Sequence, residues 1–282
     1  MIYLITGATG NIGSRVVDRL LARGERPRVF ARDPEKARAR FDNRTDVVVG
    51  DLADAASLAR ALAGVDALFL VNSGSGLDVR DEAAANVAKA SGVKLLVKLS
   101  SADAAHQVGT GVWHARGETA IQATGVGFAF VRPTGFMDNA LYWARSIKTD
   151  GVVRSSTGDG RIPFIHSDDI ADVVVKVLTT PEYEGRVLPI TGPRALSYDE
   201  MTAKIGAGIE RALTYQVISD EQAQRQQVAW GTEPAMVEAR LSIFRAIREG
   251  RLAEVTGHVE HVLGRPPIDF ERWVEQNGSA FR

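Results

Sequence analysis

The stretch from residue 2 to residue 14 reads Ile2-Tyr3-Leu4-Ile5-Thr6-Gly7-Ala8-Thr9-Gly10-Asn11-Ile12-Gly13-Ser14, an apolar strand that runs through three glycines into a helix. Gly7 allows a sharp turn, Gly10 lacks the Cβ that would block a pyrophosphate, and Gly13 allows close packing of the helix. The helix start offers backbone N–H groups and a positive dipole to phosphate. The stretch therefore predicts a dinucleotide site made by Gly7, Thr9, Gly10, Asn11, Ile12 and Gly13. A glycine turn that serves packing alone is the alternative.

Length and charge bound the class of protein. The 282 residues, 45% of them hydrophobic and 24% charged, suffice for one large α/β domain or a domain with a smaller appendage. With 34 basic and 35 acidic residues the formal charge is -1, so no net field attracts nucleic acid or anionic lipid. We expect a small-molecule substrate and a monomer or homodimer, with no nucleic-acid partner.

The chain has no cysteine, which excludes disulfides, thiolate nucleophiles and cysteine metal sites. It opens on a core strand, which leaves no room for a signal peptide. Its longest apolar runs, such as residues 67–71, are the length of a strand and far shorter than a membrane span. We therefore expect a cytoplasmic protein that does not cross a membrane.

Strand and helix patterns alternate over the first half of the chain. Apolar runs predict strands at residues 28–31, 47–50, 67–71, 95–99 and 127–131. Helices are expected from Pro34, from Ala55 and over residues 80–91 and 115–124, with Gly92 and Gly125 near two helix ends. This alternation predicts an α/β fold of the Rossmann type, a doubly wound parallel sheet whose ligand crevice lies at the carboxyl ends of the strands.

The second half is richer in turns and is expected to form a smaller α+β lid or substrate region. We assign residues 1–150 to an NAD(P)-binding domain and residues 151–282 to this region, which is not an independent domain because no linker precedes it. Helices are expected over residues 167–178 and 197–209, and a strand near 187–191 is expected to return to the sheet. Late helices at 222–227, 233–249 and 270–276 should cover a cleft.

Arg32 ends the second predicted strand, where a cation can stack on adenine and pair with a 2′-phosphate. NADP(H) is therefore favoured, while NAD(H) stays open because Asp33 would partly offset the charge. Further contacts are expected from the ends of the next two strands. Asp51 can accept a hydrogen bond from the adenine amino group or cap a helix, and Leu52 can pack on the base. Contacts to the ribose and diphosphate are expected from Val71, Asn72 and Ser73.

Several separated segments resemble the NmrA-like family of atypical short-chain dehydrogenase/reductases, between residue 1 and about residue 220. The segments are Thr6–Gly13, Ala31–Ala37, Val131–Asn139, Ile165–Ala171, Leu188–Pro193 and Leu196–Tyr198. This family includes quinone reductases, triphenylmethane-type reductases and catalytically silent redox sensors. The resemblance implies an NAD(P)H-dependent oxidoreductase that reduces a quinone or a related flat aromatic carbonyl compound.

The chain departs from typical short-chain dehydrogenases, which use a serine and a Tyr-x-x-x-Lys pair. Ser100 follows the strand at 95–99, but the next helix offers His114 and Glu118 at the spacing of that pair. Two residues four apart share one helical face, and His-x-x-x-Glu resembles quinone-reducing members of the family. We expect catalytic roles for Ser100, His114 and Glu118, with His114 protonating the reduced oxygen and Glu118 raising its pKa. A structural histidine is the alternative, with water as the proton source.

Flat side chains after strand ends favour an aromatic or quinonoid acceptor that takes a hydride from the nicotinamide C4. The expected acceptor walls are Trp113, Phe136, Met137, Trp143, Phe164 and Trp230. Pro133 and Phe136 are also expected to line the nicotinamide pocket, and Pro133 would fix the backbone there. Neither a flavin nor a metal is expected.

Other features are interpreted more simply. His258 and His261 lack a third ligand and are assigned to a solvated helix face, while Asp168 and Asp169 suit a helix start. His166 lies beside a predicted strand end, so it is a weaker candidate for a residue near the substrate. Two other functions stay open. One is an NAD(P)-binding redox sensor without turnover, and the other is an oxygen-using enzyme that modifies polycyclic aromatic metabolites.

Overall fold

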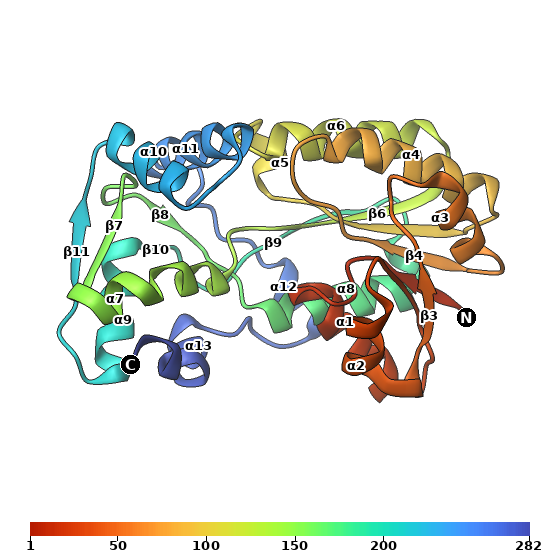
Figure 1. Cartoon of the computed structure of the whole chain (residues 1–282), viewed down its shortest axis with the longest axis horizontal. Helices are drawn as coiled ribbons and strands as arrows, with labels where there is room; N and C mark the ends of the chain where they lie inside the picture. Colours follow the sequence, from red (N-terminus) through yellow and green to blue (C-terminus); the bar gives the residue numbers. More distant parts are fainter. The chain divides into compact units, whose positions relative to one another are not determined.

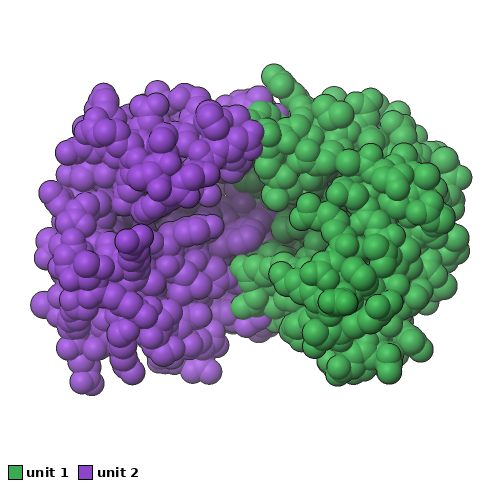
Figure 2. Space-filling view, viewed as in Figure 1, with its two compact units in different colours: residues 1–101, 113–132, 170–188 green, residues 102–112, 133–169, 189–282 purple.

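The computed structural model describes residues 1–282, which form two compact units (Figure 2). Unit 1 consists of residues 1–101, 113–132 and 170–188, and unit 2 of residues 102–112, 133–169 and 189–282. The sequence analysis placed one boundary near residue 150. The chain instead passes between the units after residues 101, 112, 132, 169 and 188, because late segments return to complete the sheet of unit 1.

A seven-stranded sheet has the order β3-β2-β1-β4-β5-β6-β9 (Figure 1). Its strands are β1 (Tyr3–Ile5), β2 (Arg28–Ala31), β3 (Asp46–Val49), β4 (Ala67–Leu70), β5 (Leu95–Leu99), β6 (Gly127–Pro133) and β9 (Val187–Ile190). The pairs from β3 to β6 are parallel. The order reverses between β1 and β4, which confirms the predicted doubly wound fold and places its topological switch point there.

Helices cover both faces of this sheet, with α3, α4 and α6 on one face and α1, α2 and α8 on the other (Figure 1). Their bounds are α1 (Asn11–Ala22), α2 (Pro34–Phe41), α3 (Ala55–Leu62), α4 (Leu77–Ala90), α6 (Gly111–Ala123) and α8 (Ser167–Thr179), with short turns η1 (Asp42–Arg44) and η3 (Pro181–Tyr183). Buried side chains such as Leu58, Leu62 and Ile121 pack with Leu68 and Leu96 of the sheet. The strands are therefore apolar on the face that α3, α4 and α6 cover.

Unit 2 contains two small sheets and a larger number of helices. β8 (Arg161–Ile162) pairs with β10 (Leu196–Ser197), and β7 (Val152–Ser155) pairs with β11 (Thr214–Val217). The helical elements are α5 (Asp103–His106), η2 (Met137–Trp143), α7 (Ala144–Asp150), α9 (Tyr198–Ile209), α10 (Asp220–Ala229), α11 (Pro234–Arg248), α12 (His258–Leu263), α13 (Phe270–Asn277) and η4 (Gly278–Phe281).

This unit has its own apolar core, which includes Met201, Ile205, Phe270 and Trp273. Phe270 and Trp273 stack at 5.2 Å between ring centroids, so α13 belongs to the core, although the sequence analysis expected it over a cleft. No helix of the protein combines the length and the apolar character that crossing a bilayer needs.

Candidate functional site

The turn after β1 requires glycine at two positions. Gly7 has φ +58°, and a Cβ there would lie 2.9 Å from the Cβ of Val71. A Cβ on Gly13 would lie 2.2 Å from the carbonyl oxygen of Gly7, so only glycine lets the helix approach the turn. Gly10 differs, because a Cβ there would meet only the Gly7 oxygen, at 3.1 Å. The space beside Gly10 is otherwise open, as close approach of a diphosphate requires.

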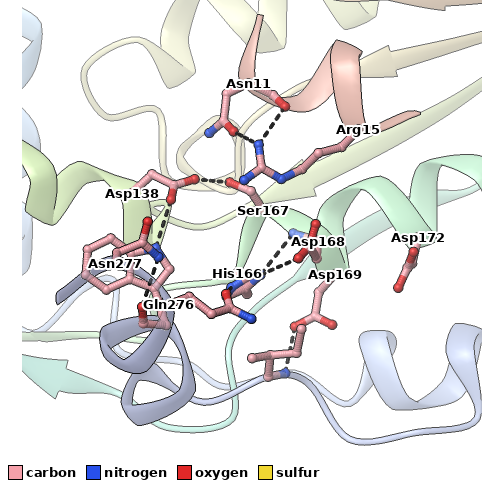
Figure 3. Close-up of polar contacts among 12 residues, drawn as sticks. Asn11, Arg15, Asp138, His166, Ser167, Asp168, Asp169, Asp172, Gln276 and Asn277 are labelled. Carbon is pink, nitrogen blue, oxygen red and sulfur yellow. Dashed lines mark hydrogen bonds and ion pairs between the residues drawn. The ribbon is translucent and has the colours of Figure 1, made fainter. Parts of the chain in front are cut away.

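The first turn of α1 suits an anion. Gly10 is its N-cap and supplies no capping side chain, and the turn contains no acidic residue. Arg15 donates from Nη1 to the Asn11 carbonyl oxygen at 3.1 Å and also bonds the Asn11 Oδ1 (Figure 3). At the switch point, the Val71 N–H donates to Thr6 Oγ1 at 2.7 Å and ties the ends of β1 and β4 together. The glycine turn therefore fits a dinucleotide diphosphate.

At the ends of β2 and β3, the acidic residues accept hydrogen bonds from the backbone, whereas the neighbouring arginine does not bond to the chain. Arg32 is exposed and makes no hydrogen bond or ion pair within the chain. Asp33 caps α2 by accepting from the Lys36 N–H at 3.0 Å, so its carboxylate is engaged in the helix start. Asp51 accepts from the Ala53 N–H at 2.9 Å, whereas the cap of α3 is Asp54. The arginine is thus free to meet a ligand while its acidic neighbour is occupied.

The loop after β4 is tied down by one arginine. Arg80 donates to the Ser73 carbonyl oxygen at 2.8 Å, to the Ser75 carbonyl oxygen at 3.0 Å and to Asn72 Oδ1 at 3.0 Å. The Asn72 amide nitrogen donates to the Leu77 carbonyl oxygen at 3.0 Å. The Asn72 side chain therefore holds the loop in shape, and a cofactor would meet the loop mainly through its backbone. Leu52, from the end of β3, is half-buried and packs on the core.

Two ion pairs lie below this loop in unit 1. Lys98 and Asp81 are fully buried and paired with each other. A Cβ on Gly117 would lie 2.4 Å from Asp81 Oδ2, so glycine lets α6 approach this pair. The second pair joins Glu118, also buried, to Arg132, whose Nε donates to Glu118 Oε1 at 2.8 Å. In each pair the acidic group is matched by one basic group.

Ser100 forms a hydrogen bond with Glu118, whereas His114 does not. Ser100 Oγ donates to Glu118 Oε1 at 2.5 Å, so serine, glutamate and Arg132 form one network. His114 makes no bond to Glu118, and its Nδ1 is buried without a hydrogen-bond partner. Burial, with smaller effects from the positive charges of Lys98 and Arg132, lowers the pKa of His114 to about 3. The expectation that Glu118 raises this pKa is wrong, and the imidazole is neutral at neutral pH.

Unit 2 contains a cavity of about 270 Å³, near the lower end of small-molecule sites. Its centre is aromatic, because the Tyr198 ring lies 4.9 Å from Trp143, 5.8 Å from Phe164 and 6.5 Å from Phe244, measured between centroids. α10 and α11 form one wall, as expected of late helices that cover a cleft. The lining comprises Thr110, Gly135, Asn139, Ala140, Tyr142, Trp143, Arg154, Ser155, Ile162, Phe164, Tyr198, Ala223, Gln226, Gln227, Trp230, Met236, Arg240, Ile243, Phe244 and Ile247.

The structure brings three of the six expected acceptor walls together in this cavity, namely Trp143, Phe164 and Trp230. Met137 is buried in the core of unit 2 instead. Phe136 forms an isolated bridge with Ile165 after β6 and does not line the cavity, and the neighbouring Pro133 is buried and accepts at its carbonyl oxygen from the Ala102 N–H at 2.9 Å. Trp113 belongs to α6, and its ring is half-buried outside the cavity lining.

Sequence reasoning missed Tyr198 and Arg240. Tyr198 lies in the segment Leu196–Tyr198 that resembles the family, but its place in the cavity lining is visible only in the folded structure. Arg240 was visible in principle, because it lies three, four and seven residues before Ile243, Phe244 and Ile247 on one helical face. A cation on an apolar helix face indicates a special environment.

The start of α8 anchors the C-terminal segment within unit 2 (Figure 3). Ser167 donates to Asp138, which also accepts from Trp273 Nε1 at 2.8 Å. His166 Nδ1 accepts from the Asp168 N–H at 3.1 Å, so its Nε2 carries the proton and donates to Gln276 Oε1 at 3.0 Å. With both ring nitrogens engaged, His166 is a structural residue.

Asp169 makes the same kind of anchor, because it accepts from the Ile268 N–H and from Arg265, each at 2.7 Å. Burial raises the pKa of Asp169. The chain contains no group of three or more acidic or histidine side chains arranged to hold a metal ion. His258 and His261 therefore do not belong to such a group.

A comparison with known protein families finds a match that covers both the glycine turn and most of the sheet of unit 1. A family described as NAD(P)H-binding matches residues 7–181, which span the glycine turn, Arg32 and the Ser100 network. The chain belongs to this NAD(P)H-binding family. The match begins at Gly7, directly after β1, and includes the glycine turn and β4, where the geometry fits a dinucleotide.

Two relatives can be aligned with almost the whole chain. The (4-alkanoyl-5-oxo-2,5-dihydrofuran-3-yl)methyl phosphate reductase of Streptomyces griseus is 36% identical over 99% of this chain and 98% of its own length. The NAD(P)H azoreductase of Xenophilus azovorans is 34% identical over 99% of this chain and 98% of its own length. A solved NADPH complex of an Escherichia coli NADPH-dependent quinone oxidoreductase has a TM-score of 0.88 at 25% identity, covering 98% of this chain and 99% of that one.

These likenesses confirm the NmrA-like resemblance and show that the protein is an NAD(P)H-dependent oxidoreductase. They agree with the geometry of unit 1, where a glycine turn and a helix start without acidic residues suit a diphosphate. The relatives are named for different acceptors, so the acceptor has to be argued from the cavity.

Proposed function

We propose that this protein uses NADPH to reduce a quinone or a related flat aromatic carbonyl compound. The observation that carries the proposal is the aromatic cavity of unit 2, where Trp143, Phe164, Tyr198 and Phe244 offer ring faces to a planar molecule. The quinone oxidoreductase among the structural neighbours supports the same acceptor class. In this proposal unit 1 binds the cofactor and unit 2 binds the acceptor.

The choice of NADPH over NADH rests on Arg32. Its guanidinium has no partner within the chain, whereas the carboxylate of Asp33 is engaged in capping α2. A free guanidinium at this strand end favours a 2′-phosphate over a ribose hydroxyl. The diphosphate would lie beside Gly10 and the first turn of α1, and the bound nicotinamide supplies a hydride.

On the acceptor side, the chain's own residues position the molecule and keep water away from it. Tyr198 lines the cavity, its hydroxyl has no hydrogen-bond partner in the chain, and burial raises its pKa so that it stays protonated. We propose that it donates to a carbonyl oxygen of the acceptor. His114, held neutral, is a poor acid, and the Ser100 hydroxyl is already donated to Glu118. The proton that completes reduction therefore comes from solvent.

The test is NADPH oxidation against a panel of benzoquinones and naphthoquinones, beside aliphatic ketones. Reduction of several quinones but of no aliphatic ketone is expected. Met236→Trp, which fills the cavity, should raise the KM for quinones without changing NADPH affinity measured by calorimetry. Val228→Trp, an exposed position of α10 outside the lining, is the matched control. Tight NADPH binding with no quinone turnover would refute the proposal.

A further inference from the structure

Arg240 is the cation of the cavity that lacks an acidic partner. Its Nη1 donates to Gln227 Oε1 at 2.7 Å, and its guanidinium carbon lies 5.8 Å from the centroid of the Tyr142 ring. Gln227 is buried and also accepts from Thr232 Oγ1 at 3.4 Å. A guanidinium has five N–H donors, and the chain uses one of them here. The remaining donors are oriented by the amide and the ring but have nothing to bind in the protein.

The other cation of the lining is in a different state. Arg154 pairs with Asp150 at 2.8 Å and donates to Gln216 Oε1 at 3.1 Å, so its charge is compensated. No aspartate or glutamate lines the cavity. On α11 itself, Glu238 pairs with Arg245. The cavity therefore carries an uncompensated positive charge at Arg240.

The positive charge also has a defined place in the cavity. Tyr142 and Trp230 line it but are 63% and 48% exposed, so they form its mouth. Phe164 and Tyr198, 3% and 8% exposed, form its floor. Arg240 lies over Tyr142 and therefore belongs to the mouth. A ligand that satisfied both parts would have a flat ring inside and a negative group outside.

We propose that the acceptor carries an anionic oxygen group, a carboxylate, phosphate or sulfonate, which Arg240 binds at the mouth while the ring occupies the aromatic floor. The planar guanidinium can donate two parallel hydrogen bonds to such a group. Gln227 and Tyr142 fix its orientation, so little side-chain entropy is lost on binding. This inference rests on the proposed function, because it describes the acceptor of the same cavity.

A matched pair of acceptors tests the proposal, 1,2-naphthoquinone and 1,2-naphthoquinone-4-sulfonate. The wild-type protein should show a KM about tenfold or more lower for the sulfonate, from one charge-assisted contact. Arg240→Gln should abolish this preference, so that the KM values of the sulfonate and of the neutral quinone differ by less than about twofold in the variant. Arg240→Lys keeps the charge and should retain part of the preference. Arg245→Gln removes the same charge from the same helix outside the lining and should leave the preference intact.

A binding measurement separates this inference from the proposed reaction. Trp143 and Trp230 line the cavity, so tryptophan fluorescence can report the binding of naphthalene-2-sulfonate and of 2-naphthol without turnover. The sulfonate should bind more tightly, and Arg240→Gln should remove the difference. Equal affinity of the two probes in the wild-type protein, or a preference that survives Arg240→Gln, would overturn the inference. Failure to reduce any quinone would instead refute the proposed function and leave the binding result standing.

Discussion

His114→Gln offers the sharpest test of the electrostatics in unit 1. Burial, together with Lys98 and Arg132, lowers the pKa of the folded-state histidine from 6.5 to about 3. In the unfolded chain the same imidazole titrates near its ordinary value. As pH falls below about 6.5, the unfolded state takes up a proton that the folded state refuses, so the folded state loses stability until the pH reaches about 3. Glutamine cannot titrate and should abolish this loss.

The size of the effect follows from the same two pKa values. At pH 4.5 the protonated form of an unfolded histidine is about a hundredfold more populated than its neutral form, whereas the buried histidine remains neutral. Each factor of ten in this population ratio changes the free energy of unfolding by about 1.4 kcal/mol. The ring is partly exposed, and solvent screening reduces the expected difference to about 2 kcal/mol. Between pH 7 and pH 4.5, the wild-type protein should therefore lose about 2 kcal/mol more stability than the variant.

The assay is urea unfolding of both proteins at the two pH values, with fluorescence and circular dichroism compared to establish two-state behaviour. Carboxylate protonation affects both proteins alike and cancels in the difference. An equal loss in wild type and variant would refute the assignment of His114 as a buried neutral group. Turnover offers a second readout, because the rate of quinone reduction by the wild-type protein should not change with an apparent pKa near 6.5.

Four further substitutions test other parts of the molecule. Arg32→Ala should weaken NADPH binding by about 1 to 3 kcal/mol and spare NADH, whereas equal losses in calorimetry would contradict NADP selectivity. Gly10→Ala should reduce NADPH affinity at least about tenfold with a Tm change within about 3 °C, because its Cβ would meet only one protein atom. Tyr198→Phe should raise the quinone KM severalfold and leave NADPH affinity unchanged. Lys98→Met should cost about 3 to 5 kcal/mol in urea unfolding by leaving the buried Asp81 without its charged partner, and adding Asp81→Asn should recover part of it.

The fold could be predicted because its signals are local. The three glycines, the apolar runs of strand length and Pro34 at the start of a helix each lie within a few residues of the structure that they specify. Boundaries were less accurate, as α6 begins at Gly111 and not near residue 115. The return of a strand near residues 187–191 to the sheet was predicted, and β9 lies beside β6. The repeated passage of the chain between two units was not predicted.

The close packing at Gly7 and Gly13 agrees with what the sequence predicted for the turn, whereas the predicted side-chain partner of Glu118 does not. Glu118 was assigned to His114 because residues four apart share a helix face. Its actual partners are Ser100 and Arg132, which are 18 and 14 residues away in sequence. A carboxylate bonds the nearest cation that the fold brings to it, and spacing on one helix carries no information about a neighbouring strand.

The neutral histidine bears on which carbonyl compounds the protein reduces. Reduction of an aliphatic ketone produces an alkoxide, a strong base that needs a proton donor during the reaction. Reduction of a quinone produces a phenolic oxygen with a pKa of about 10, whose anion is stable enough to wait for solvent. With His114 neutral and the Ser100 hydroxyl donated to Glu118, unit 1 offers no strong acid.

A cavity with an uncompensated cation at Arg240 and a free phenol at Tyr198 instead favours an acceptor whose product remains anionic for a time. A positive charge stabilises a developing negative charge most when that charge is delocalised over a ring that the cavity can hold flat. We therefore expect rates to follow the reduction potential of the quinone and not the basicity of its carbonyl oxygen. A series of substituted naphthoquinones would separate the two, and faster turnover of the more basic carbonyl compounds would show that an unrecognised acid takes part.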